Sequence, residues 1–414
     1  MQNIDLLMIG SGPANLSIAV ALEEHASTSA IGSSIMLEKE TCVSWQKGML
    51  FPEAQSQVSF LKDLVTLRDP TSRFSFLNFL HKTGKLEGFI NLQTFNPYRR
   101  EISDYLQWIA DNLTKTRIRY GSNVTRVQPE LTDDGEICAW LVSTEKGEEY
   151  RAKKLVFGAG RDINIPEAFK KLGQDRVTHS SNYLTSLEGI DKARVNNIAV
   201  IGGAQSSVEI YQSCLEHFPH ARVKMIMRSI GLVNYEGSKF TNTLFSNDHI
   251  NTFFNVDTTS RAQVLAEMHS TNYSGVAPAT LDTLYRYHYL QELNGSNRAA
   301  IYTQCNIQSA HDDGSGTVVT WFDKKQNKTE TEKFDLVFLG TGYQNKIPAI
   351  FNESMLMMDR TSLNVNRHYR ADLPYTGGAS LHLQGVNEST HGIADSLLSV
   401  LAQRSQEIVN DLHA

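Results

Sequence analysis

The first residues of the chain contain the pattern that most restricts its fold. A continuous apolar run over Ile4–Ile9 is typical of a strand buried on both faces. Glycines follow at positions 10 and 12, and residues 16–22 then have helical spacing. This order predicts a parallel strand, a tight turn at Gly10 and a helix. Gly12 would let a pyrophosphate approach the backbone, and the helix N-terminus would supply N–H groups and partial positive charge.

A second apolar segment completes this unit. Residues 34–37 are apolar and Glu38 follows them, about 20–30 residues beyond the glycines, where a carboxylate would hold a ribose hydroxyl. Strand, turn, helix, strand and acid in this order are more specific than the glycines alone. We therefore predict a dinucleotide-binding unit of the FAD type. The alternative is a doubly wound sheet whose glycine turn binds no ligand.

The same unit recurs in the middle of the chain. The apolar run Asn197–Ile201 leads into Gly202, Ala204 and Ser207, so two of the three glycine positions carry small substitutes. A structural turn without ligand is therefore a stronger alternative here than in the first unit. A further strand ends at Arg228, and an arginine in this place suits the 2′-phosphate of NADP.

Two such units predict an α/β protein with two dinucleotide-binding (Rossmann-like) domains, one for FAD and one for NADPH. Strands over 155–157 and 336–339 both end at glycines, where the chain would cross between the domains. We expect an FAD domain over 1–170, to which 345–414 return, and an NADPH domain over 171–344. The latter would include a smaller, mostly helical substrate region at about 232–300.

Composition excludes several other classes of protein. The 414 residues carry 45 acidic and 39 basic side chains, a net charge of −6, so binding to nucleic acid is disfavoured. The four cysteines form no CxxC pair, which argues against disulfides and dithiol flavin reductases. The histidines show no metal-ligand spacing. No apolar window is long enough for a membrane span and no signal peptide is evident, so we expect a cytoplasmic protein.

Longer motifs resemble those of the microbial N-hydroxylating flavin monooxygenases, which are the ornithine, lysine and diamine N-hydroxylases of siderophore pathways. The resemblance extends over nearly the whole chain, and the ornithine-type branch is nearest. The motifs that carry it are QVSFLKDLVTLRDPTSRFSFLNFL at 57–80, FNPYR at 95–99, HSSNY at 179–183, residues 202–209, 227–228, FTN at 240–242, TNY at 271–273, GTGY at 340–343, LQGVNESTHG at 383–392 and DSLLS at 395–399.

The resemblance implies a defined reaction. NADPH reduces bound FAD, and the reduced flavin and O₂ form a C4a-hydroperoxide. Its distal oxygen passes to a neutral primary amine, giving a hydroxylamine for siderophore biosynthesis, while bound NADP⁺ excludes water. The protein orients the substrates and needs no acid–base triad. Because the amine must be unprotonated, activity should rise with pH.

The resemblance also implies residue roles. It assigns cofactor binding to Gly10, Gly12, Pro13, Asn15, Glu38, Trp45, Gln46, Gln57, Arg99, Ser206, Arg228, Tyr343 and Leu398. Within that set, Arg99, Ser206 and Arg228 would contact NADPH. It assigns catalytic roles to Gln57 and Asn272, and substrate binding to Lys62, Asn242, Asn272 and Ser399. The alternatives are ordinary ones: Lys62 and Arg99 as solvated surface charges, and Ser206 as a helix N-terminal residue.

Four departures from the family pattern leave the substrate open. Gln46 replaces a histidine, Ser56 a common methionine and Ala204 a glycine, and residues 237–243 read GSKFTNT in place of Asp-Ser-Pro-Phe-x-Asn-Glu. L-Ornithine is the first substrate to expect; L-lysine, putrescine, cadaverine and histamine are alternatives. A non-catalytic flavin-binding protein or an uncoupled NADPH oxidase is the alternative of another class. Family members are often dimers or tetramers, so we expect a homo-oligomer.

Overall fold

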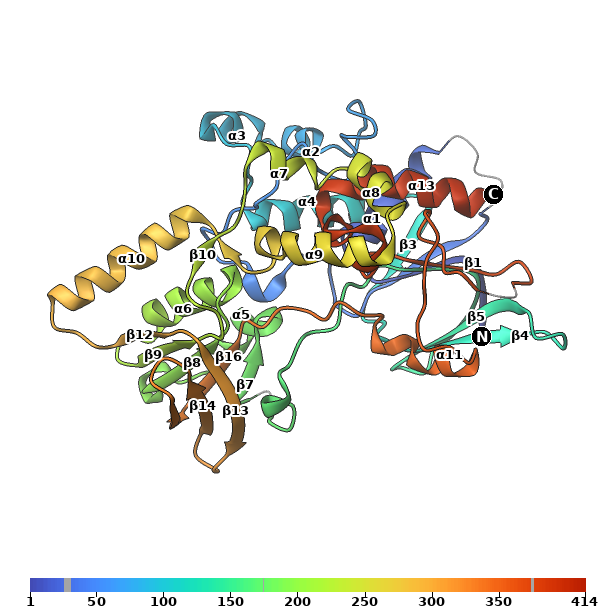
Figure 1. Cartoon of the computed structure of the whole chain (residues 1–414). Helices are drawn as coiled ribbons and strands as arrows, with labels where there is room; N and C mark the ends of the chain where they lie inside the picture. The colour runs from blue at the N-terminus through green and yellow to red at the C-terminus, as the bar shows by residue number, and fades with distance from the viewer. Residues whose placement is uncertain (26–30, 174, 374–375) are drawn as a thin grey trace.

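The chain is arranged around two separate sheets (Figure 1). The computed structural model describes residues 1–25, 31–173, 175–373 and 376–414, and it describes 270–272 by backbone only. In each sheet, the strand that begins one of the two glycine units pairs in parallel with the strands on both sides of it. The predicted fold class, α/β with two dinucleotide-binding domains, is confirmed.

The first sheet has the strand order β3-β2-β1-β6-β5-β4, and β17 pairs with β6. The later half of β6 pairs in parallel with β17, while its earlier half pairs antiparallel with β5. A segment near the C-terminus therefore completes a sheet begun at the N-terminus. Its strands are β1 (Gln2–Ile9), β2 (Ser34–Leu37), β3 (Thr116–Arg119), β4 (Val124–Leu131), β5 (Ile137–Thr144), β6 (Glu149–Phe157) and β17 (Ser380–Leu383).

The apolar run of β1 is continuous because each face of the strand enters a different core. Leu6 and Met8 pack on one side of the sheet, whereas Leu7 and Ile9 pack on the other, as the two-residue period of a strand requires. The first core lies beneath helices from both ends of the chain and from the segment between them. These are α1 (Pro13–Glu24), α2 (Phe76–Lys82), α3 (Leu86–Leu92), α4 (Arg99–Asp111) and α13 (Leu401–His413).

The second sheet is entirely parallel, in the order β12-β9-β8-β16-β7. Helix α6 (Gln205–His217) follows β8, as the second glycine unit predicts. A three-stranded antiparallel sheet flanks it. The strands are β7 (Val177–His179), β8 (Asn197–Ile201), β9 (Arg222–Ile226), β12 (Ala299–Tyr302) and β16 (Leu336–Leu339), with β13 (Cys305–Asp312), β14 (Thr317–Asp323) and β15 (Lys328–Phe334) in the antiparallel sheet.

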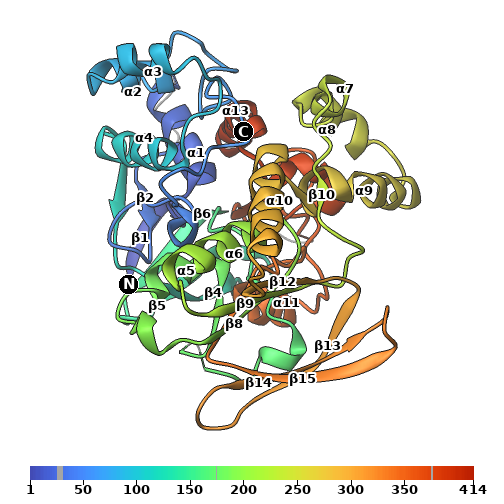
Figure 2. The same ribbon diagram turned by 90° about the vertical axis from the view of Figure 1, so that its left-hand side faces the viewer.

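The segment predicted to bind substrate is mostly helical. Figure 2 shows α10 beside α6, while α7, α8 and α9 lie together in another part of the molecule. Helices α8 and α9 contact α12 (Glu388–His391) of the C-terminal segment. The elements are β10 (Val233–Asn234), α7 (Lys239–Thr243), α8 (Asn247–Phe254), α9 (Thr258–Asn272), β11 (Gly275–Val276) and α10 (Pro278–Leu293). The domain boundaries near 170 and 345 stay a prediction.

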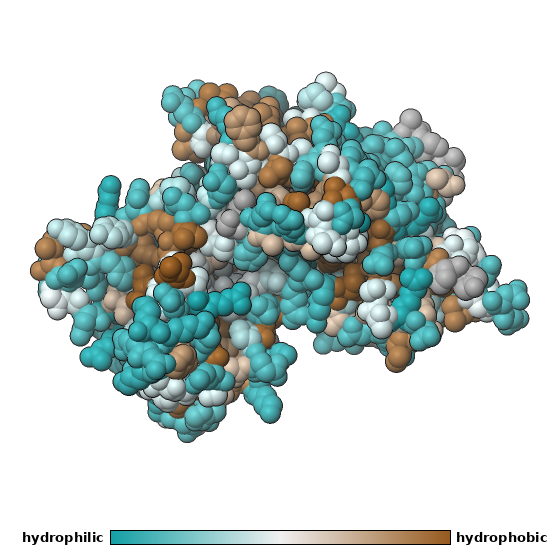
Figure 3. Space-filling model, viewed as in Figure 1, coloured by the Kyte–Doolittle hydropathy of each residue, from teal (hydrophilic) through white to brown (hydrophobic). Residues whose placement is uncertain are grey.

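The short helices α5 (Tyr183–Ser186) and α11 (Asn352–Met357) complete the set of α-helices in the described residues. The face in Figure 3 is mostly hydrophilic, with hydrophobic side chains at α3, where Ile90 is 63% exposed. None of the helices in the described parts of the chain combines the length and the apolar composition that crossing a bilayer would take.

Candidate active site

Both glycine turns open onto one cleft of about 1470 Å³ between the two sheets. Its wall includes 11–14 from the first turn and 202–206 from the second. The ends of β6 and β16 contribute 158–161 and 340–343. The carboxyl ends of parallel strands from both sheets therefore meet here, which is where dinucleotides bind in doubly wound folds. The volume exceeds the usual range for one small ligand.

The first turn is held by glycine geometry and by one buried amide. Gly10 has φ +87°, and a Cβ there would lie 2.7 Å from the Ala159 Cα. The Asn15 amide nitrogen donates to the carbonyls of Ile9 and Gly10, at 2.8 Å each. Its oxygen accepts from the Gln384 amide at 2.9 Å. Asn15 is fully buried, so it shapes the turn rather than the surface of the cleft.

The start of α1 fits a bound diphosphate. Gly12 is the N-cap and Pro13 follows, with no side chain capping the helix. A Cβ on Gly12 would meet only the Gly158 carbonyl, at 3.6 Å, so the backbone can be approached closely. The Glu38 carboxylate accepts from the Ser11 N–H at 2.7 Å and from its hydroxyl at 2.8 Å. Uncapped N–H groups beside a carboxylate at the end of β2 are the donor and acceptor set that FAD requires.

The second turn fits NADPH in the same way. Ala204 is the N-cap of α6 in an extended conformation (φ −108°), again without side-chain capping. Alanine adopts this conformation freely, so the departure from glycine does not distort the turn. Ser206 lies in the first helical turn, and both residues line the cleft. Arg228 also lines the cleft; it is exposed, and among the described residues its guanidinium has no hydrogen-bond or ion-pair partner. It is therefore free to bind a phosphate.

The remaining predicted cofactor residues come from three distant segments. Trp45, Gln46 and Gln57 line the cleft from the loop after β2, and Leu398 lines it from the C-terminal segment. Tyr343, which follows β16, is 45% exposed and also lines the cleft. The structure thus brings these residues together around the two turns.

Arg99 is placed differently from a solvated charge or a free phosphate ligand. It is buried at the start of α4, and its Nη1 and Nη2 donate to the two Glu209 carboxylate oxygens at 2.8 and 2.6 Å. Nη1 also donates to the Met49 carbonyl at 3.1 Å. Sequence reasoning missed Glu209, because no local pattern pairs residues 110 positions apart.

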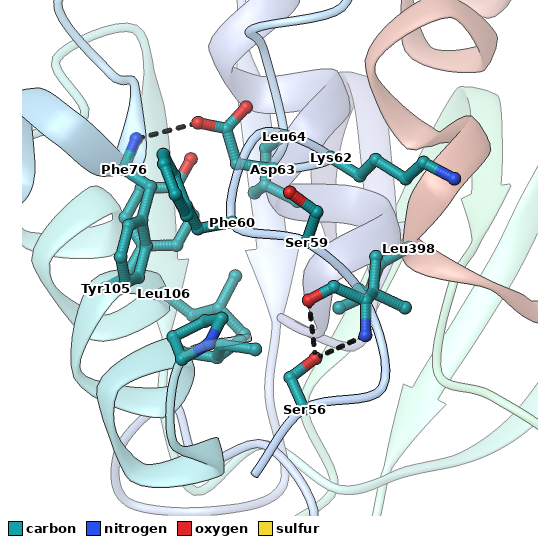
Figure 4. Close-up of a pocket in the computed structure, with 13 residues that line it drawn as sticks. Ser56, Ser59, Phe60, Lys62, Asp63, Leu64, Phe76, Tyr105, Leu106 and Leu398 are labelled. Carbon is teal, nitrogen blue, oxygen red and sulfur yellow. Dashed lines mark hydrogen bonds between the residues drawn. The ribbon is translucent and has the colours of Figure 1, made fainter. Parts of the chain in front are cut away.

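Lys62 lines a small cavity that shares Ser56 and Leu398 with the wall of the cleft (Figure 4). Its side chain extends away from Phe60 and Tyr105, which line the other side of this cavity. The segment that follows Lys62 is held by Asp63, whose carboxylate accepts the Val65 N–H at 3.0 Å and the Phe76 N–H at 2.7 Å. Burial raises the pKa of the Asp63 carboxyl. Lys62 is therefore presented from a rigid segment, outside the wall of the large cleft.

The other predicted substrate residues lie where α7 meets the C-terminal segment. The Ser399 hydroxyl donates to the Phe245 carbonyl at 3.0 Å, and the Phe245 N–H donates to the Asn242 carbonyl at 3.3 Å. Neither Asn242 nor Ser399 lines the large cleft. Asn272 ends α9, and its side chain lies outside the described residues.

A second group that sequence reasoning missed joins three segments at the cleft. The Arg161 Nη1 lies 3.3 Å from the Tyr273 hydroxyl and 3.8 Å from a Glu388 carboxylate oxygen. The Tyr273 hydroxyl donates to Glu388. Burial raises the pKa of both Glu388 and Tyr273. Tyr273 falls within the TNY motif, but nothing in the sequence indicates its partners.

Comparison with known proteins decides the family. Residues 2–345 match the family described as L-lysine 6-monooxygenase/L-ornithine 5-monooxygenase. The L-ornithine N(5)-monooxygenase of Pseudomonas aeruginosa is 33% identical over 418 residues, covering 99% of this chain and 93% of the relative. The chain belongs to this family. The predicted enzyme class, a NADPH-dependent flavin N-hydroxylating monooxygenase acting on a small amine, is confirmed.

Solved structures agree with this assignment. The ornithine hydroxylase from Pseudomonas aeruginosa has a TM-score of 0.91 and 32% identity, with 99% of each chain covered. An ornithine N-hydroxylase from Kutzneria sp. 744, in a complex with reduced FAD, NADP⁺ and L-ornithine, has a TM-score of 0.90, 33% identity and the same coverage. The L-lysine 6-monooxygenase from Pseudomonas syringae has a TM-score of 0.85 and 28% identity, also over 99% of both chains. The predicted cofactors FAD and NADPH are confirmed.

Proposed function

We propose that this monooxygenase hydroxylates the side-chain amine of L-ornithine, using NADPH and O₂. The observation that carries the proposal is the meeting of two uncapped helix N-termini, α1 and α6, in one cleft. Two dinucleotides bound at these ends would extend into the same space, so that a reduced nicotinamide can reach a flavin. Relatives named as L-ornithine N(5)-monooxygenases, about one third identical over nearly the whole chain, support the substrate.

The residues divide the work by position. The first turn of α1 would hold the FAD diphosphate and Glu38 a ribose hydroxyl, while Ser206 and Arg228 would hold NADPH. Bound FAD supplies electron transfer and O₂ activation, the chemistry that protein side chains lack. Gln57 would orient the reacting groups by amide hydrogen bonds, with Asn272 at the amine end of the substrate.

Recognition of the amino acid is assigned to residues beside the cleft. We propose that Lys62 and Asn242 bind the α-carboxylate and α-amino groups, and that Ser399 lies at the amine end. The altered 237–243 loop still begins a helix, because the Ser238 hydroxyl accepts the Thr241 N–H at 3.1 Å. The loop lacks the acidic and proline residues of the family pattern, which changes its charge and its stiffness and keeps lysine and the diamines as alternatives.

A product assay tests the proposal directly. FAD-loaded enzyme would be given NADPH, O₂ and one of ornithine, lysine, putrescine, cadaverine or histamine, with hydroxylamine and H₂O₂ measured in parallel. We expect hydroxylamine from ornithine, coupled to NADPH use. If only one of the other amines gave hydroxylamine, that amine rather than ornithine would be the substrate. Peroxide alone with all five would contradict the proposal, and no anaerobic flavin bleaching by NADPH would indicate a non-catalytic flavoprotein.

We further propose that the product enters siderophore biosynthesis, that the enzyme acts in the cytoplasm and that it forms a dimer or tetramer. Loss of siderophore on gene deletion, restored by the hydroxylated amine, tests the first. Cell fractionation tests the second, and light scattering on the purified protein tests the third.

A further inference from the structure

The Arg99–Glu209 pair joins the two dinucleotide-binding parts of the molecule. Arg99 begins α4, which packs on the first sheet, and Glu209 lies on α6, which follows β8 of the second sheet. Their side chains are only 10% and 11% exposed, and both residues line the cleft. The bond is bidentate, so it restricts the direction of the contact as well as its distance.

Glu209 also contacts the second glycine turn (residues 202–206), called the NADPH turn below. The Gln205 amide nitrogen donates to the Glu209 Oε1 at 2.8 Å, and the Gln205 oxygen accepts the Ala277 N–H at 2.7 Å. Gln205 is the first residue of α6 and precedes Ser206. Ala277 is the N-cap of α10. The Glu209 carboxylate therefore links α4 of the first domain to the NADPH turn and, through Gln205, to the start of α10.

The buried pair restricts the orientation of the two domains more than it adds net attraction between them. Taking two charges out of water offsets much of the attraction that a buried ion pair gains, whereas leaving one charge alone is costly. Such a pair contributes little to stability by itself, but it strongly disfavours any domain arrangement that separates its members. The Arg99 Nη1 also donates to the Met49 carbonyl, which belongs to the cleft-lining loop after β2.

We propose that Glu209 is a positioning residue for flavin reduction. By holding the Arg99 guanidinium and the Gln205 amide, it sets the orientation of the NADPH turn relative to the flavin site. Glu209 acts through Arg99 and Gln205 and performs no chemical step itself. The inference rests on the proposed use of NADPH as the reductant of bound FAD.

The test compares Glu209→Gln with Glu216→Gln, the same change at an exposed position of the same helix. Anaerobic stopped flow would give the rate of flavin reduction by NADPH, and small-angle scattering of the same FAD-loaded proteins would report domain arrangement. We expect Glu209→Gln to slow reduction at least tenfold and to change the scattering profile, with FAD content retained. Glu216→Gln should match the wild type in both measurements.

Three results would overturn the inference. The first is a rate of flavin reduction in Glu209→Gln that lies within about twofold of the wild-type rate. The second is slower flavin reduction in Glu209→Gln with an unchanged scattering profile, because the effect would then lie in cofactor binding. If Glu209→Gln does not fold, Arg99→Lys keeps the charge but loses the bidentate geometry, and wild-type values for that variant would be the third. Failure of NADPH to reduce even the wild-type flavin would instead contradict the proposed function.

Discussion

Replacing Asn15 by alanine tests whether a buried amide, rather than the glycines alone, holds the FAD turn. The change removes two donated bonds and one accepted bond. The Ile9 carbonyl keeps a partner, the Gly158 N–H at 3.0 Å. The Gly10 carbonyl and the Gln384 amide nitrogen lose theirs. Each of these two groups left unpaired costs about 1–3 kcal/mol, so we expect the free energy of unfolding to fall by about 2–6 kcal/mol.

Urea unfolding followed by circular dichroism would measure this loss, and a flavin titration would measure FAD affinity. Asn112→Ala is the control, because the Asn112 amide is exposed and donates to the Trp108 carbonyl of α4, the helix that Asn112 ends, at 2.7 Å. That variant should stay within about 0.5 kcal/mol of the wild type. A loss below about 1 kcal/mol for Asn15→Ala, with unchanged FAD affinity, would refute the reasoning.

Three further predictions concern the cleft and its surroundings. Arg228→Ala should raise the KM for NADPH by about 10- to 100-fold and leave that for NADH nearly unchanged, since a charge-assisted phosphate bond is worth about 1.5–3 kcal/mol. Lys62→Ala should raise the KM for ornithine by about one to two decades, through loss of the carboxylate contact. Burial lowers the pKa of His391 from 6.5 to about 4. The unfolded state therefore binds the proton more strongly, and stability should fall by about 2 kcal/mol as the pH drops from 7 to 5.

Each of these has a result that would contradict it. Equal effects of Arg228→Ala on both nicotinamide cofactors would remove the 2′-phosphate assignment. An unchanged KM for the preferred amine in Lys62→Ala would indicate a substrate without a carboxylate. For His391, urea unfolding at pH 7 and pH 5 should show a smaller difference in His391→Asn than in the wild type; equal differences would place the acid sensitivity elsewhere.

Local patterns in the sequence were sufficient for the two nucleotide-binding units. The predicted strands Ile4–Ile9 and Asn197–Ile201 fall within β1 and β8, and helices follow both glycine turns. This succeeds because strand, turn and helix are contiguous, so the residues that shape each unit are neighbours in the chain. Long motifs then identified the family, and with it the cofactors.

The partners of the site residues depend instead on how the chain returns on itself. The sequence contains Arg99 but not its bond to Glu209, and Asn15 but not its contact with Gln384, which lies 369 positions away. Tyr273, likewise, meets Glu388 only after the substrate region has packed on the C-terminal segment. Composition and spacing determined which ligands the chain can bind. Only the tertiary structure decided which charges are buried and paired, because burial and pairing depend on segments that meet in space without being near in sequence.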